Sequence, residues 1–203
     1  SLGNFITIND ILKKYEADAL RLFIASTYYR SPIDYSDDAL EQSTQSLRRI
    51  RDTLDNLSQA MKIADSSIRN VNEKIIEKEI LEVKNRFLNS MDDDFNTAKA
   101  LAAFFELIKI GNVTSSKEVT QKLLREIYDL IIEFGGIIGL HLERTEKLPR
   151  EAEELIAERE IARKNKDWKK ADEIRKTLRA MGIILQDYPS GTTWSFEREE
   201  EKK

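Results

Sequence analysis

Residues 155–196 read LIAEREIARKNKDWKKADEIRKTLRAMGIILQDYPSGTTWSF, a pattern that predicts a helical hairpin followed by two short strands. The first helix is expected over Leu155 to Lys164, and the second over Trp168 to about Met181. Asp167 precedes the second helix, where its side chain can accept a backbone N–H of the first turn. Gly182 follows the same helix, at a place where a left-handed residue often ends a helix.

The strands after this hairpin predict a small β-hairpin. Residues 183–185 read as a short strand, residues 187–191 as a turn and residues 192–196 as the returning strand. With the two helices, they predict a small α+β module over residues 150–203 that ends in a charged tail.

The helical hairpin is strongly basic. From Arg163 to Arg179 the chain carries eight basic and three acidic residues, which leaves a local charge of +5 in a chain of net charge −4. Such a local field favours a polyanionic partner. Trp168 and Asp172 are four residues apart and share a helix face. An aromatic ring can stack on an unpaired base and a carboxylate can accept from a guanine edge, so the hairpin suits single-stranded RNA.

A second interpretation of the same residues stays open. Trp168 and four apolar residues after it follow one another at helical spacing, so Trp168 is also a candidate for the core, and the basic run a candidate for a solvated face. The four are Ala171, Ile174, Leu178 and Met181.

The preceding residues predict a bundle of helices. Ser36 is a good N-cap, and over residues 40–64 apolar side chains recur every seven residues with a second set interleaved, which predicts one long helix. Further helices are expected over residues 72–90, 98–110 and 119–134. Two short helices, over residues 9–15 and 17–28, come before them.

Glycines mark the expected breaks. Residues 111–116 read as a loop. Residues 135–139, Gly-Gly-Ile-Ile-Gly, lack the lysine of a phosphate loop and follow a helix, so they predict a helix terminator and close-packing site.

Few residues suggest catalysis or metal binding. Asp92, Asp93 and Asp94 could bind Mg²⁺, but adjacent side chains diverge, and acidic residues before a helix commonly cap it. His141 is the single histidine, and no cysteine is present, so we expect neither a catalytic residue nor a metal site here. Asp18 and Arg21 are expected to form a structural ion pair or part of a solvated face.

Composition indicates a globular protein of one or two domains. The chain of 203 residues has 40% hydrophobic and 34% charged residues. The absence of cysteine fits a reducing compartment, so we expect a cytoplasmic protein. No apolar run approaches the roughly 18 residues of a membrane span, and no signal peptide is visible. Because the chain begins with Ser1, we expect a piece of a longer protein.

Three groups of motifs resemble cysteinyl-tRNA synthetases. KDWKKADEIR (166–175), GIILQD (182–187) and GTTW (191–194) resemble the C-terminal end of that family. DALR (18–21) resembles the sequence that names the DALR helical domain of several class I synthetases. YRSPIDY (29–35) and DDDFNT (92–97) are also similar to the family, although a proline is common there at the position of Ala98.

The resemblance implies a mostly α fold. A DALR-type antiparallel helix bundle is expected over residues 18–145, followed by the α+β module over residues 150–203, which binds the anticodon in the family. Residues 1–17 would be the remnant of a catalytic domain, and Ser1 the final serine of its KMSKS nucleotide-binding loop. ATP and zinc are then expected in a catalytic domain upstream, with no cofactor in this fragment, which would be inactive alone.

The implied partner is tRNA(Cys) through its anticodon stem-loop, with the catalytic domain in cis and no membrane. Trp168 is expected to stack on a base, and Asp172 and Asp187 to accept from base edges. Arg163, Lys164 and Lys169 are expected to contact phosphates, while Trp194 is expected in the core.

Two alternatives remain. One is a related ligase that joins cysteine to an amino sugar in mycothiol synthesis, although it is not expected to keep the pattern from Asp167 to Trp194. The other is a helical protein-interaction module, which the seven-residue repeat over residues 40–64 favours.

Overall fold

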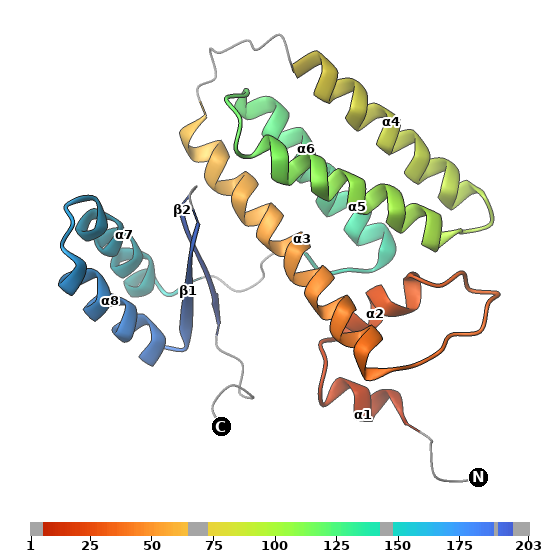
Figure 1. Ribbon diagram of the computed structural model, residues 1–203, viewed down its shortest axis with the longest axis horizontal. Coiled ribbons are helices and arrows are strands. Elements are labelled where there is room, and N and C mark those ends of the chain that lie inside the picture. The colour runs from red at the N-terminus through yellow and green to blue at the C-terminus, as the bar shows by residue number, and fades with distance from the viewer. Residues whose placement is uncertain (1–5, 65–72, 143–147, 189–190, 197–203) are drawn as a thin grey trace. The chain divides into compact units, whose positions relative to one another are not determined.

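The computed structural model describes residues 6–64, 73–142, 148–188 and 191–196. The chain divides into two compact units, Ser1–Glu143 and Arg144–Lys203, and each is described by itself. The first holds the helices α1 to α6, and the second holds the helices α7 and α8 and the strands β1 and β2 (Figure 1). The predicted mostly α fold is confirmed. None of the described helices is long and apolar enough to cross a bilayer.

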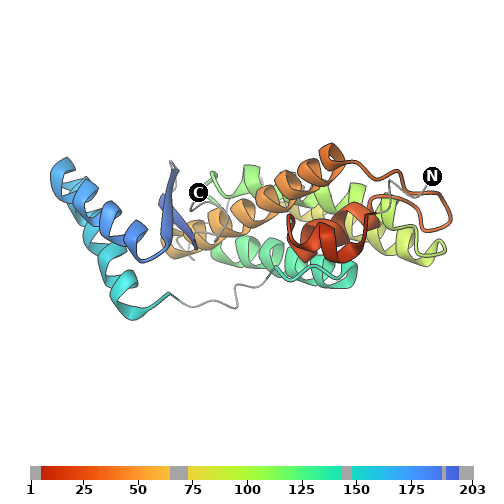
Figure 2. The same ribbon diagram turned by 90° about the horizontal axis from the view of Figure 1, so that it is seen from below.

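The centre of the first unit is a bundle of four long helices. They are α3 (Asp37–Ile63), α4 (Glu73–Asp92), α5 (Thr97–Thr114) and α6 (Gln121–Ile138), and they lie side by side in both views (Figures 1 and 2). Their apolar faces meet in one core, in which the rings of Phe87 and Phe134 stack with centroids 3.9 Å apart.

The long helix α3 begins and packs as its sequence predicts. The hydroxyl of Ser36 accepts the backbone N–H of Ala39 at 3.1 Å. The residues of the seven-residue repeat are buried inside the unit, so the repeat forms a bundle interface rather than an exposed seam. They include Leu40, Leu47, Leu54, Leu57 and Met61.

Two short helices pack against the start of α3. The helix α1 (Ile8–Leu12) begins with a capping box in which Thr7 and Asp10 satisfy each other's backbone groups. The helix α2 (Ala17–Ala25) follows it and ends before the predicted Tyr28. Leu40 of α3 belongs to the small core that joins α1 and α2 to the bundle.

The loop predicted over residues 111–116 is wrong, because α5 continues to Thr114. Gly111 is buried within this helix. A Cβ atom built there would lie 3.1 Å from Thr53 and 3.2 Å from Ile127. Glycine therefore lets α5 approach α3 and α6 closely, and this contact outweighs its weak helix propensity.

Different glycines near the end of α6 serve as the predicted helix terminator and as the predicted close-packing site. The helix continues through Gly135 and Gly136, and Gly139, with φ of 90°, ends it in the left-handed conformation. Gly135 is the close-packing site, since a Cβ atom there would lie 2.3 Å from a methyl group of Leu142.

The second unit is a helical hairpin followed by a β-hairpin. The helix α7 (Arg150–Lys164) begins earlier than predicted, and α8 (Trp168–Ala180) is terminated by Met181 and Gly182, the latter with φ of 75°. The strands β1 (Ile183–Tyr188) and β2 (Gly191–Phe196) pair antiparallel, with Ile183 opposite Phe196 and Tyr188 opposite Gly191.

The predicted turn of this β-hairpin is too long. Asp187 and Tyr188 continue the first strand, and Gly191 already belongs to the second. Residues 189–190, at the centre of the predicted turn, lie outside the described residues. Asp, Pro, Ser and Gly are typical turn residues, so the sequence favoured a longer turn. Their presence does not show how far the pairing between the two strands extends.

Candidate nucleic-acid interface

The tip of the α7–α8 hairpin carries exposed basic residues. The chain turns through residues 165–167, where Lys166 has φ of 60° and the N–H of Asp167 donates to the carbonyl of Ala162 at 2.9 Å. The carboxylate of Asp167 then accepts the N–H of Lys170 at 3.1 Å, so the predicted cap of α8 is confirmed.

Trp168 lies outside the core, because its residue is 59% exposed. The core of this unit gathers at the other end of the hairpin, where Ile174 and Leu178 of α8 meet Ile183 and Leu185 of β1. The interpretation of Trp168 as a core residue is therefore wrong. Its helical spacing is correct, but the strands cover only the later turns of α8.

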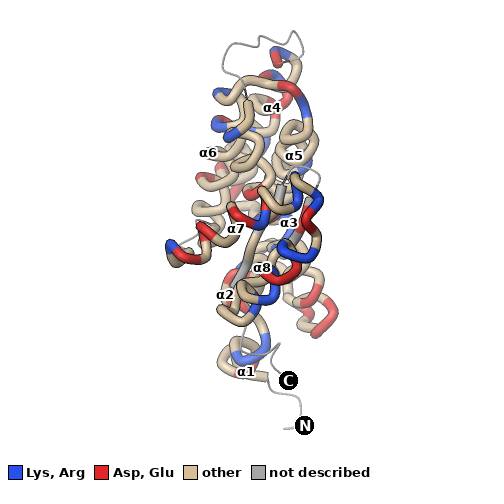
Figure 3. The backbone as a smooth tube through the Cα atoms, turned by 90° about the vertical axis from the view of Figure 1, so that its left-hand side faces the viewer, with Lys and Arg blue, Asp and Glu red and all other residues tan. Residues whose placement is uncertain are grey.

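Lys and Arg occur along both α7 and α8 (Figure 3). They fall into two groups according to whether they form ion pairs. Some are paired within the protein, such as Lys170, whose ammonium lies 2.7 Å from Glu158. Lys164, Lys166 and Lys169 are exposed and have no ion pair within the described part of the chain. Lys166 and Lys169 thus flank Trp168 in the chain, and Lys164 precedes the same turn.

Asp187 forms the second polar centre of this unit. Its carboxylate accepts from both terminal nitrogens of Arg159, at 2.9 and 2.8 Å, and from the hydroxyl of Thr192 at 2.9 Å. Arg163 also donates to it, and Arg175 lies 3.7 Å away. The hydrogen bonds from Arg159, foremost, lower the pKa of Asp187 to about 2.

These contacts give Asp187 a structural task that the sequence did not reveal. Arg159, with a side chain 4% exposed, joins α7 to β1 through it, and the Nε of Arg159 is buried with no hydrogen-bond partner within the described structure. The sequence offered one indication that Arg159 is buried. This residue shares a face of α7 with Ala152 and Ala162, which are both buried. Contact of Asp187 with a base edge stays a prediction, and the base would share the carboxylate with these arginines.

The other predicted site residues lie near the tip. Asp172 is exposed on α8, one turn after Trp168, and Lys164 and Lys169 flank the turn. Arg163 is half-buried because of its ion pair with Asp187. Trp194 packs, partly buried, against the core of the unit, as predicted. Ser1 lies outside the described residues.

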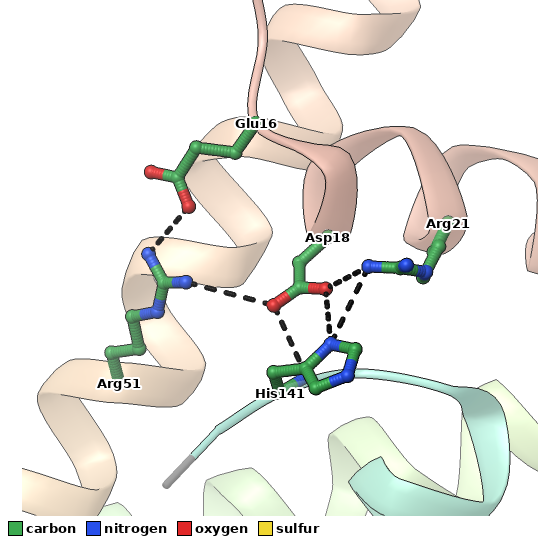
Figure 4. Close-up of polar contacts among 5 residues, drawn as sticks. All are labelled: Glu16, Asp18, Arg21, Arg51 and His141. Atoms are coloured by element: carbon green, nitrogen blue, oxygen red, sulfur yellow. Dashed lines mark hydrogen bonds and ion pairs between the residues drawn. The ribbon is translucent and has the colours of Figure 1, made fainter. Parts of the chain in front are cut away.

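The Asp18 cluster, formed by Asp18, Arg21, Arg51, Glu16 and His141, belongs to the first unit (Figure 4). Asp18 accepts from Arg21 at 2.7 Å and from the backbone N–H of His141 at 3.1 Å, so the predicted structural ion pair is confirmed. Burial would raise the pKa of Asp18, but the hydrogen bonds from His141 and Arg21 outweigh it and lower the pKa. The cluster fastens the segment after α6 to α2.

The two aspartates that follow α4, Asp93 and Asp94, make separate contacts. Asp94 accepts the hydroxyls of Tyr28 and Tyr29, and Asp93 pairs with Lys99. Asn96 caps α5 through the N–H of Lys99. Over the ranges that the structure describes, no three His, Cys, Asp or Glu side chains gather as metal ligands would.

Comparison with protein families assigns these parts. The cysteinyl-tRNA ligase anticodon binding domain matches residues 145–194, which contain the whole hairpin and its predicted site residues. The DALR domain matches residues 86–143, and the class I (C) catalytic domain of tRNA synthetases matches residues 1–45. The chain is 41% identical over 196 residues to the cysteine–tRNA ligase of Lachnospira eligens. This alignment covers 96% of the chain and 42% of that relative.

The chain belongs to the cysteine–tRNA ligase family. Further curated relatives are the cysteine–tRNA ligases of Shouchella clausii, 37% identical over 197 residues, and Geobacter sulfurreducens, 40% identical over 213 residues. The chain spans 42% of the length of the first of these and 44% of the second. The part of the chain that matches a catalytic domain includes α1, α2 and the start of α3, which share one small core.

Proposed function

We propose that this chain is the tRNA-recognition part of an enzyme that ligates cysteine to tRNA(Cys) with ATP, and that it binds the anticodon stem-loop. The observation that carries the proposal is the exposed Trp168 at the tip of the α7–α8 hairpin, with exposed lysines close to it in the chain that have no ion pair in the described structure. A tip of this composition suits a looped RNA, because bases stack on the ring while cations hold the backbone.

Each residue of the tip has a separate role in this proposal. Trp168 stacks on an anticodon base, and Asp172, on the same face of α8, accepts from the Watson–Crick edge of that base or its neighbour. Lys164 and Lys169 contact phosphates. Arg163 also donates to a phosphate while it keeps its ion pair with Asp187. Asp187 holds the arginines in place and offers its remaining acceptor capacity to a base.

Catalysis is proposed only for the whole ligase. ATP and zinc belong to the proposed catalytic domain, and the residues described here do not fit a zinc ion. The chain contains no cysteine and one histidine, and that histidine is bonded to Asp18. No step of the ligation is derived from these residues.

The two alternatives account less well for the same residues. The repeat over residues 40–64 lies inside the bundle, so it does not supply the exposed seam that a protein-interaction module needs. A ligase that joins cysteine to an amino sugar has no use for an exposed aromatic and basic hairpin. The match of residues 145–194 to an anticodon-binding domain favours tRNA as the partner.

Titration of the protein with the anticodon stem-loop of tRNA(Cys) tests the proposal. We expect salt-sensitive binding that weakens when the anticodon is changed. Lys164→Gln and Lys169→Gln should each weaken binding and reduce the salt slope by about 1, whereas Lys109→Gln, an exposed lysine on α5, should change neither. Equal binding of both loops would contradict anticodon recognition, and absence of binding at low salt would contradict the function altogether.

A further inference from the structure

A second surface of exposed aromatic residues lies on the first unit, where the segment after α2 meets the turn between α4 and α5. We name it the Asp94 cluster, after the carboxylate that organises it. Asp94 accepts the hydroxyl of Tyr28 at 2.6 Å and that of Tyr29 at 2.9 Å, and it lies 2.9 Å from the guanidinium of Arg30. Phe95 follows it in the chain and completes the cluster.

The side chains of Tyr29 and Arg30 are held in place although they are exposed. The Nε of Arg30 donates to the hydroxyl of Tyr29 at 2.8 Å, and its guanidinium lies 5.3 Å from the centre of the same ring. The rings of Tyr28 and Tyr29 are 5.0 Å apart. Tyr29 is nevertheless 57% exposed and Phe95 67% exposed. Fixed rings lose little conformational entropy when they bind a partner.

The backbone under these side chains is strained. Asp94 and Phe95 have φ of 53° and 51°, in the left-handed region that a bulky residue rarely adopts. Hydrogen bonds hold this turn, since the N–H of Phe95 donates to Met91 and that of Asn96 to Ser90. The strain brings no burial of the Phe95 ring, so it does not serve the core of this unit. Strain that keeps an aromatic ring in solvent indicates binding.

The charges of this surface are largely matched. Arg30 offsets Asp94, and Lys99 lies 3.0 Å from Asp93. No excess of cations marks a path for phosphates. The exposed groups of the cluster are flat rings and a guanidinium, which stack on nucleobases irrespective of sequence.

We propose that Tyr29, Phe95 and Arg30 form a stacking surface for an unpaired base of the tRNA outside the anticodon stem-loop. This inference rests on the proposed function, because it requires RNA as the partner. The first unit would then contribute a base contact of its own, distinct from the hairpin tip of the second unit.

Two RNA probes separate this contact from that of the hairpin. They are a whole tRNA(Cys) transcript and its isolated anticodon stem-loop, each titrated against the full chain. Tyr29→Ala and Phe95→Asn should weaken binding of the whole transcript by roughly tenfold and leave the stem-loop affinity unchanged. The salt slope should stay the same because no phosphate contact is lost. Leu81→Ala on α4, a residue also 57% exposed, serves as the matched control and should change nothing.

Phe95→Asn also distinguishes loss of a contact from loss of stability. Asparagine tolerates the left-handed conformation better than phenylalanine, so this variant should unfold at the same temperature as the unaltered protein or a higher one. A lower affinity for the transcript would then report a lost contact rather than a damaged fold.

The contrary outcomes are distinct. Unchanged affinity of both variants for the transcript would overturn the stacking surface, and so would equal losses for both RNAs. Self-association of the unaltered protein that Tyr29→Ala abolishes would assign the surface to a second copy of the chain and also overturn it. If the unaltered protein fails to bind even the stem-loop, the proposed function itself fails.

Discussion

Single carboxylates organise the polar contacts in both units. Asp187 gathers Arg159, Arg163 and Thr192 in the second unit, and Asp18 gathers Arg21 and the backbone of His141 in the first. In each case one acceptor joins segments far apart in the sequence. A buried or half-buried cation such as Arg159 depends on this acceptor, because an unpaired charge away from water is costly.

Asp187→Asn is therefore expected to destabilise the second unit, by about 2–4 kcal/mol at neutral pH, because Arg159 loses its charged partner. Both tryptophans of the chain lie in this unit, so unfolding followed by tryptophan fluorescence measures its stability. Asp172→Asn, an exposed carboxylate on α8, is the control and should change the free energy of unfolding by less than about 0.5 kcal/mol. Equal stability of the two variants would contradict a structural role for Asp187.

The same residue predicts a dependence on pH. Because the folded pKa of Asp187 is lowered to about 2, its carboxylate stabilises the fold above the higher pKa of the unfolded chain. This stabilisation should disappear as the pH falls from about 4 toward 2, and the Asp187→Asn variant should lack that part of the decline.

Sequence predicted single residues well where the interaction is local. Ser36 and Asp167 cap their helices as expected, since a cap depends only on residues three positions away. The environment of Asp187 could not be predicted, because its partners come from α7 and from the facing strand. The exposure of Trp168 could not be predicted either. It depends on which turns of α8 pack against the strands, and helical spacing does not specify this.

At the scale of elements, helix types are more predictable than helix ends. All the long helices of the bundle were expected, but α5 passes through Gly111 and α6 through Gly135 and Gly136. Local propensity favours a break at glycine, whereas packing against a neighbouring segment favours continuation. The neighbour that decides between them lies far away in the sequence, so the sequence pattern alone could not settle these ends.

The adjacent glycines of α6 allow a paired test. Gly135→Ala should lower the free energy of unfolding by about 1–3 kcal/mol, because the new methyl group would collide with the buried Leu142. Gly136→Ala meets open space and should raise it by up to about 1 kcal/mol through helix propensity. Chemical denaturation followed by circular dichroism measures both. Similar effects of the two substitutions would show that Gly135 has no packing role.

At the scale of the whole molecule, two units carry two separate candidate contacts for RNA. The hairpin tip presents a tryptophan with unpaired lysines in the described structure, and the Asp94 cluster presents exposed aromatic rings with matched charges. The division into a bundle and a small α+β module follows from hydrophobic periodicity and turn residues. The placement of Tyr29 beside Asp94 could not be read from the sequence, since the two residues lie 65 positions apart.

The fluorescence of Trp168 tests the central claim most directly. The anticodon stem-loop of tRNA(Cys) should quench the tryptophan emission of the unaltered protein, because a stacked base lies against the exposed ring. In Trp168→Phe, binding measured by competition should persist while the quenching disappears, and Trp168→Ala should bind roughly tenfold more weakly. Full quenching in Trp168→Phe, or unchanged affinity in Trp168→Ala, would contradict a stacking role for Trp168 and with it the proposed anticodon contact.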